Sequence, residues 1–179
     1  MKYVGGFTLI EVLVTFLIIS IGLLGLAALQ TSTVNDQFEA YQRIQITTLL
    51  DDMATRIRTN PDEAKKLLYT LESNPIYGGS ILGPCTATPG AARDLCVWND
   101  LLAGAAATNG AAAAPLNARG CLTKVEQGTA EGKILIRIAV AWQGITESAV
   151  PGDGCGEGLY GAESPLSFRR VAYRDVLVR

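Results

Sequence analysis

The sequence predicts an α+β fold in which a long N-terminal helix packs on a small antiparallel sheet. An apolar run from Phe7 to Leu29 passes into an amphipathic helical pattern that ends near Thr59. The segment ILIRIAVAWQ, residues 134–143, alternates with a period of two, and a further strand-like segment lies near the C-terminus. A chain of 179 residues is long enough for one domain of ordinary size plus an N-terminal appendage.

The N-terminal apolar run is long enough to cross a membrane. In a helix, residues 7–29 extend about 35 Å, which exceeds the hydrocarbon core of a bilayer. The run is longer than the apolar part of a secretory signal peptide, about 7–15 residues, and no clear small-residue cleavage site follows it. We therefore expect a single-pass anchor, with Lys2 on the cytoplasmic side and the rest of the chain across the membrane.

Glu11 is the only charged residue in this run. A carboxylate within a membrane costs about 2.5–3.5 kcal/mol on insertion scales, less near an interface, and such residues usually mark a partner. Cleavage after Gly6 would create a positively charged amine on Phe7, one helical turn from Glu11 or close to Glu11 of a neighbouring subunit. The alternative is a carboxylate that reaches the membrane interface and has no partner.

Four cysteines, Cys85, Cys96, Cys121 and Cys155, lie in the C-terminal half, and the chain contains no histidine. None of the cysteines forms a C-x-x-C pair, which argues against a zinc site, and we expect no metal. An even number without such spacing is typical of two disulfides in an oxidising compartment, in agreement with the expected orientation. Four cysteines allow three connectivities, and the residues alone do not choose among them.

The helical pattern continues beyond the apolar run. Val34, Phe38 and Tyr41 share one face, and no proline or glycine interrupts residues 26–60. A second apolar stripe consists of Ile46, Leu49, Leu50, Met53 and Ile57. We expect one continuous helix from about Phe7 to Thr59, near 80 Å long at the usual rise per residue, with its second half packed on the sheet.

The middle of the chain predicts two shorter helices. After Thr59, Asn60 is suited to cap a new helix, Pro61 to occupy its first position and Glu63 to act as a capping-box acid, with the helix ending near Leu71. Residues 92–102 place Leu95, Trp98 and Leu102 at helical spacing, and we assign Trp98 to the core. The alanine-rich residues 103–118 are predicted to be a loop.

Three strands complete the prediction. The segments CLTKVEQ (121–127) and ILIRIAVAWQ (134–143) form a hairpin with a glycine-containing turn at 128–133. The segment SFRRVAYRDVLV (167–178) is a third strand, with Val171, Tyr173 and Leu177 on one face. A glycine-rich loop, residues 144–167, joins the last two strands.

No catalytic constellation is present in the sequence. Without histidine, a Ser-His-Asp or Cys-His arrangement is excluded, and the adjacent Asp51 and Asp52 diverge on a helix. The segment GDGCGEGLYG lacks the phosphate-binding pattern G-x-x-x-x-G-K-[ST]. Four arginines near the C-terminus are expected to form a solvated strand edge rather than a DNA-binding stripe: Arg169, Arg170, Arg174 and Arg179. We expect no enzyme activity, no cofactor and no nucleic-acid partner.

The string Gly6-Phe7-Thr8-Leu9-Ile10-Glu11, after a short basic leader, resembles the class III signal of type IV prepilins and type II secretion pseudopilins. The resemblance implies that a prepilin peptidase cleaves between Gly6 and Phe7 and methylates the new N-terminus of Phe7. It also implies that Glu11 helps subunits to enter the filament in register. Many major pilins carry a proline about two-thirds along the apolar run, whereas this chain has Gly22 and Gly25 there, which soften the helix or pack closely on other helices.

Further motifs resemble the PilV-type minor pilins: IGLLGLAALQ, RIRTNP, CVWNDLL and IAVAWQG. This resemblance implies the type IV pilin fold, with a leader at 1–6, a transmembrane half-helix at 7–29 and a periplasmic globular domain at 30–179. On this layout we expect disulfides Cys85–Cys96 and Cys121–Cys155, each stabilising the domain by about 3–4 kcal/mol.

The implied function is that of a minor pilin, held in the inner membrane by a single span and then placed in the pilus, where it primes assembly. The implied partners are other minor pilins, the major pilin, the prepilin peptidase, the inner-membrane assembly machinery and, for a protein at the tip, a tip adhesin. The alternatives are a minor pseudopilin of a type II secretion system, a DNA- or surface-binding pilin, and a simple membrane-anchored periplasmic domain.

Overall fold

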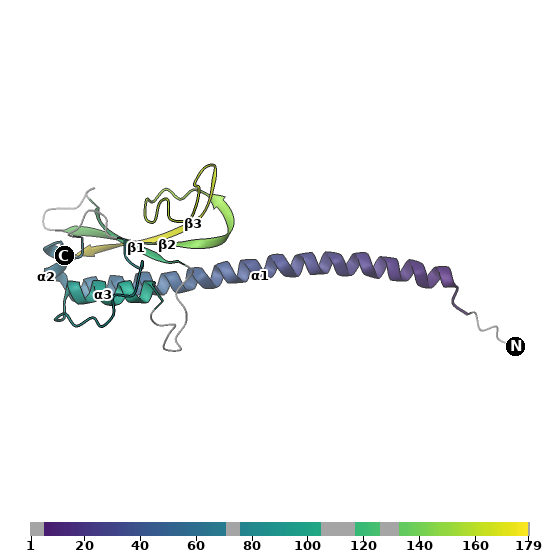
Figure 1. The fold of residues 1–179 in the computed structure, drawn as a ribbon, viewed down its shortest axis with the longest axis horizontal. Coiled ribbons are helices and arrows are strands. Elements are labelled where there is room, and N and C mark those ends of the chain that lie inside the picture. The colour runs from purple at the N-terminus through teal and green to yellow at the C-terminus, as the bar shows by residue number, and fades with distance from the viewer. Residues whose placement is uncertain (1–5, 71–75, 105–116, 126–132, 179) are drawn as a thin grey trace. The chain divides into compact units, whose positions relative to one another are not determined.

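The computed structural model describes residues 6–70, 76–104, 117–125 and 133–178. The helices are α1 (Leu9–Thr59), α2 (Pro61–Lys65) and α3 (Ala91–Leu102), and the strands are β1 (Arg119–Val125), β2 (Ile134–Ala149) and β3 (Leu166–Val178) (Figure 1). The strands form an antiparallel sheet in the order β1-β2-β3. A long N-terminal helix followed by a small antiparallel sheet confirms the predicted α+β, type IV pilin-like arrangement.

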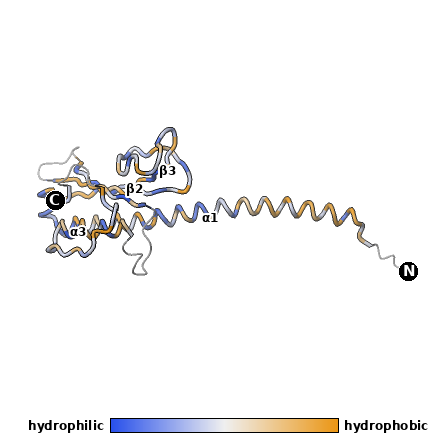
Figure 2. The backbone as a smooth tube through the Cα atoms, viewed as in Figure 1, coloured by the Kyte–Doolittle hydropathy of each residue, from blue (hydrophilic) through white to orange (hydrophobic). Residues whose placement is uncertain are grey.

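The chain forms two compact units, Met1–Ala40 and Tyr41–Arg179, and α1 begins in the first and ends in the second. In the first unit every large apolar side chain from Leu9 to Leu29 is at least 48% exposed, the lowest value being that of Val14. Figure 2 shows this apolar character along the N-terminal part of α1. By length and composition, α1 contains a segment able to cross a membrane.

The core of the second unit lies between helices and sheet. The last turns of α1 contribute a stripe at helical spacing, Ile46, Leu50, Met53, Ala54 and Ile57. These side chains share one cluster with Trp98 of α3 and with Ile136, Ile138 and Val140 of β2. Trp98 is fully buried and its indole N–H donates to the Leu49 carbonyl at 3.0 Å, which confirms its assignment to the core.

The end of α1 agrees with the prediction, and the helix after it does not. Pro61 lacks an N–H and disfavours helical geometry at Asn60, so α1 ends at Thr59. The next helix extends only to Lys65 rather than to about Leu71, because Leu67 adopts a left-handed φ of 60°. Asn60 occupies the predicted N-cap position, but its side chain makes no capping hydrogen bond and instead donates to Asp94 at 2.9 Å.

The central strand β2 is longer than predicted because it continues to Ala149. It pairs with β3 from Ile134 to Gln143 and again at Ser148 and Ala149, with a register shift between Gln143 and Ser148. The glycine-rich loop therefore covers residues 150–165 rather than 144–167. This loop packs on the sheet face away from the helices, where Cys155 and Tyr160 contact the small side chains Ala139 and Ala141.

The prediction that the C-terminal arginines are solvated is wrong for Arg169. Its side chain is only 2% exposed and forms an ion pair with Glu163, with Nε–Oε1 at 2.7 Å and Nη2–Oε2 at 2.8 Å. It also donates to the carbonyls of Asp153 and Cys155 at 2.5 and 2.9 Å. The Arg169 guanidinium can be buried because it is fully paired. Its bonds also hold the glycine-rich loop on the sheet.

Two neighbouring arginines also bond within the domain, and of these Arg174 is 43% exposed, as predicted. Arg170 donates to Ser148 Oγ at 2.5 Å and to the Thr146 carbonyl at 2.8 Å, and so it fills the irregular part of β2. Arg174 forms an ion pair with Asp51 of α1, whereas Asp52 pairs with Arg56, which confirms that the two aspartates diverge.

On β3 the prediction that Val171, Tyr173 and Leu177 share one face is confirmed, and this face lies opposite the one that the helices cover. Tyr173 and Leu177 are 57% and 41% exposed, while Val176 and Val178 on the opposite face enter the core. The helix at 92–102 is confirmed, with its start at Ala91. Most of the predicted alanine-rich loop, the hairpin turn and Arg179 lie outside the described residues.

Candidate functional site

The first candidate site is the segment that precedes α1. The helix begins at Leu9 rather than at Phe7, so Gly6, Phe7 and Thr8 have no regular secondary structure. Phe7 is 86% exposed and Gly6 has no neighbouring atom that a Cβ would contact. A peptide bond between Gly6 and Phe7 in this state is accessible to an enzyme, because a protease needs an exposed, non-helical backbone.

Thr8 fixes the start of α1. Its carbonyl accepts hydrogen bonds from the N–H groups of Glu11 at 3.1 Å and Val12 at 3.3 Å, which places Thr8 at the N-cap position. Thr8 and Glu11 have the T-x-x-E spacing of a capping box. This spacing is visible in the sequence and predicts the helix start at Leu9, two residues later than the expected start at Phe7.

Glu11 lies in the first turn of α1 with an exposed side chain. Within the described part of the chain its carboxylate has no hydrogen bond or ion pair. An acidic group in the first turn is favoured by the partial positive charge of the helix N-terminus. The carboxylate therefore has unused acceptor capacity.

The two disulfides lie in the second unit, far along the sequence from Gly6, Phe7 and Glu11. Cys85 pairs with Cys96 across 11 residues and Cys121 pairs with Cys155 across 34 residues. The first joins the loop before α3 to α3, and the second joins β1 to the glycine-rich loop. Both pairings are those expected from the resemblance.

A set of potential metal ligands, Cys85, Cys96 and Asp100, lies close together. The two sulfur atoms are joined in a disulfide, so neither can act as a thiolate. The Asp100 carboxylate accepts a hydrogen bond from the Leu82 N–H at 2.7 Å. The disulfide and the Asp100 hydrogen bond hold the loop before α3 against this helix, and the three residues do not offer a metal site.

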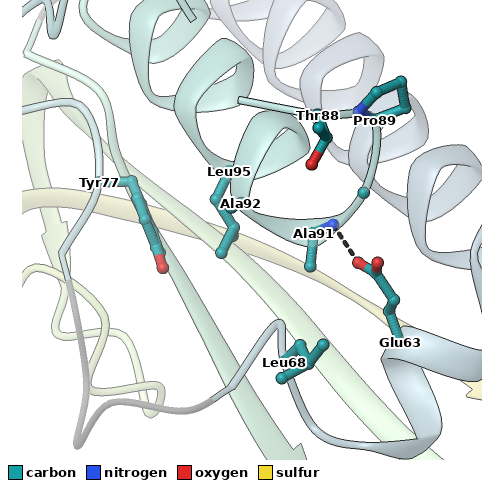
Figure 3. A pocket seen from close by; sticks show the side chains of 9 residues that line it. Glu63, Leu68, Tyr77, Thr88, Pro89, Ala91, Ala92 and Leu95 are labelled. Atoms are coloured by element: carbon teal, nitrogen blue, oxygen red, sulfur yellow. Dashed lines mark hydrogen bonds between the residues drawn. The ribbon is translucent and has the colours of Figure 1, made fainter. Parts of the chain in front are cut away.

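The second candidate site is an open pocket of about 310 Å³ at the N-terminus of α3 (Figure 3). Its walls are largely apolar and include Leu68, Ala92 and Leu95. Glu63 of α2 lies at one side, and its carboxylate accepts a hydrogen bond from the Ala91 N–H (Figure 3). The predicted role of Glu63 is thus corrected, because it caps α3 and not its own helix.

Gly90 makes this contact possible. Its φ of 146° lies in a region that favours glycine, and a Cβ there would lie 2.6–3.0 Å from atoms of the Glu63 carboxyl group. The glycine therefore lets the Glu63 carboxylate rest against the turn before α3.

A second carboxylate anchors the same end of α3. Asp94 accepts hydrogen bonds from the Tyr69 hydroxyl at 2.6 Å and from the Asn60 amide at 2.9 Å, and it pairs with Arg56 at 3.3 Å. Burial, followed by the hydrogen bond to Asp94, raises the pKa of Tyr69 well above its usual value. The network joins the end of α1 and the turn after α2 to α3.

Comparison with known proteins identifies the N-terminal segment. Residues 1–27 match the family model of the prokaryotic N-terminal methylation motif. No match to the chain was found among curated proteins or among solved structures. The motif indicates a type IV pilin-like or pseudopilin-like protein and suggests a structural role, and the exposed apolar helix fits membrane anchoring.

Proposed function

We propose that this type IV pilin-like protein is a minor pilin of the PilV type that helps to prime assembly of a type IV pilus. Residues 1–6 are the leader, residues 7–29 anchor the chain in the inner membrane, and residues 30–179 form a periplasmic domain. After cleavage and assembly the protein becomes part of the pilus, together with the major pilin and other minor pilins.

The observation that carries the proposal is the N-terminal methylation motif at the head of an exposed apolar helix. The Gly6–Phe7 bond precedes the helix and is open to a prepilin peptidase. Cleavage there removes the leader but keeps the anchor. It also creates the Phe7 amine, and this cation offsets the cost of placing Glu11 in lipid.

A minor pseudopilin of a type II secretion system has the same N-terminal features and is the second candidate. A DNA-binding stripe on β3 is not favoured by its three described arginines: Arg169 is buried, Arg170 binds Ser148 and Thr146, and Arg174 pairs with Asp51. A nucleic-acid surface needs basic groups that are free to contact phosphates.

Mass spectrometry of the membrane-extracted protein tests the processing. We expect a chain that begins at Phe7 and is heavier than the unmodified peptide by one methyl group. A Gly6→Val chain, in which the residue before the cleaved bond is changed, should keep the leader. Recovery of wild-type protein that still carries Met1–Gly6 would exclude a prepilin.

Substitution Glu11→Ala tests the assembly role. We expect normal leader cleavage, because the scissile bond is unchanged, and at least tenfold less protein in sheared pili, because the Phe7 amine loses its partner. Asp36→Ala, at an exposed acidic position of the same helix outside the apolar run, is the control. Normal incorporation of the Glu11 variant would contradict the pairing.

A clean deletion separates the two systems. Loss of surface pili and twitching with normal secretion of extracellular enzymes is expected for a minor pilin. Normal pili with enzymes retained in the periplasm would instead assign the protein to a secretion pseudopilus.

A further inference from the structure

The pocket beside α3 is independent of the N-terminal motif and has a charge pattern of its own. Five of its lining residues have no charge or hydroxyl group at the cavity: Leu68, Pro89, Ala91, Ala92 and Leu95. Against these apolar walls stands the single carboxylate of Glu63 (Figure 3). A volume of about 310 Å³ is at the lower end of ligand pockets, which range over about 300–1,000 Å³.

The Glu63 carboxylate is only partly used by the protein itself. One oxygen, Oε2, accepts the Ala91 N–H, and in the described part of the chain Oε1 has no hydrogen-bond donor. The N-terminus of α3 carries about half a positive charge, so the carboxylate and the helix end together still leave a net negative charge beside the cavity. The pocket therefore favours a cation over an anion or a neutral group.

The shape of the site selects the kind of cation. Leu68 and Leu95 offer apolar contact to an alkyl chain, and Glu63 Oε1 offers a charge-assisted hydrogen bond to its tip. Lysine and arginine side chains combine an apolar stem with such a tip. Metal ions fit poorly, because one free carboxylate oxygen and the hydroxyl oxygens of Thr88 and Tyr77 provide too few oxygen ligands.

We propose that this pocket receives the side chain of an arginine or lysine projected by a partner protein, with the cationic tip on Glu63 and the stem between Leu68 and Leu95. The capping bond to Ala91 holds the carboxylate in place before the partner binds, so little additional ordering is needed. The proposal holds whether the chain belongs to a pilus or to a secretion pseudopilus.

The test uses the full-length, isotope-labelled protein in a non-ionic detergent and two probes of equal shape. N-propylguanidinium reproduces the end of an arginine side chain, and N-propylurea is its neutral counterpart. Amide shifts of Ala91, Ala92 and Leu95 are followed during each titration. We expect saturable shifts with N-propylguanidinium at millimolar concentrations and at least fivefold weaker binding of N-propylurea.

Three variants locate the binding. Glu63→Gln keeps an acceptor for the Ala91 N–H but removes the charge, and it should weaken N-propylguanidinium at least fivefold. Asp62→Asn removes the same charge one residue away, from an exposed position outside the pocket lining, and should bind as the wild type does. Ala92→Leu places a larger side chain in the pocket, keeps Glu63 and should abolish binding.

The outcomes decide the proposal. Equal binding of the two probes would show that charge is not recognised, and undiminished binding in Ala92→Leu would place the cation outside the pocket. Either result overturns the proposal. A lack of saturable amide shifts at Ala91, Ala92 and Leu95 overturns it as well. Acetyl-arginine methylamide should bind at least as well as free arginine, whereas binding of free arginine alone would replace the protein partner by an amino acid.

Discussion

At the scale of single residues, packing in the second unit requires the absence of a side chain at one position and a long charged side chain at another. Gly120 of β1 lies directly against the Trp98 ring and the Leu102 side chain, so the strand and α3 approach closely there. Arg169 is the opposite case, because its long charged side chain fills the space between sheet and loop and is fully paired.

Substitution Gly120→Ala should destabilise the domain by about 1–3 kcal/mol, since the added methyl group overlaps the Trp98 ring and Leu102 and forces them to move. Thermal unfolding followed by near-ultraviolet circular dichroism measures the effect. Gly79→Ala is the matched control, because a Cβ there meets nothing within 4 Å. An unchanged melting temperature for Gly120→Ala would show that the close approach is not rigid.

Substitution Glu163→Gln should cost about 2–3 kcal/mol at neutral pH, because it leaves the buried Arg169 without its counter-ion. The hydrogen bond from Arg169 lowers the pKa of Glu163, so this stabilisation is present above the unfolded-state pKa of about 4.3 and is lost as the pH falls through the folded-state pKa.

The wild type should therefore lose more stability than Glu163→Gln when unfolding is compared at about pH 7 and about pH 3. Glu157→Gln, at an exposed position of the same loop, should follow the wild type. Parallel pH profiles of the wild type and Glu163→Gln would contradict this account.

At the scale of elements, the N-terminus of α3 is held by two carboxylates from different sources. Glu63 approaches it from α2, and Asp94, in the first turn of α3 itself, reaches back to Asn60 and Tyr69. Both groups are acidic and lie where the helix dipole favours negative charge. The short helix α2 and the turn after it are thus fixed by α3 rather than by a helical pattern of their own.

Substitution Asp94→Ala should destabilise the domain by about 2–3 kcal/mol, because the buried Tyr69 hydroxyl loses its acceptor. Tyr69→Phe removes the donor as well, so the double variant should cost less than the sum of the single variants, with a coupling above about 0.5 kcal/mol. Urea unfolding of the four proteins measures the cycle. Additive effects would mean that the hydrogen bond contributes nothing.

At the scale of the whole molecule, burial begins well after the apolar run. The first buried residue of the described chain is Gln42, and all core clusters are formed by residues from Ile46 onward. The apolar residues up to Leu29 are exposed and contribute nothing to the core. The apolar segment therefore adds nothing to the free energy of burial that stabilises the globular part, although both include residues of α1.

A chain that begins at Gln30 should therefore be soluble without detergent and should unfold cooperatively. We expect its melting temperature to lie within a few degrees of the value for the full chain in detergent, because it keeps every core residue. Circular dichroism melts of both proteins measure this. A molten or aggregated fragment would show that the apolar segment takes part in folding.

Elements whose signal is local and repeated can be predicted from the residues alone. The apolar run and stripe of α1, the spacing of Leu95, Trp98 and Leu102, and the alternation in β2 each specify helix or strand over many residues, so single exceptions do not matter. The methylation motif at residues 1–27 is equally local, and it was found for the same reason.

The partners of single polar groups, in contrast, depend on how the folded elements pack. Glu63 was expected to cap its own helix and caps α3, Asn60 was expected to cap and binds Asp94, and Arg169 was expected in solvent and is buried. Each of these groups can satisfy its charge or hydrogen bonds in several ways of similar free energy. Each group binds the partner that the packed elements bring within hydrogen-bonding distance. The identity of that partner depends on contacts between residues far apart in the chain.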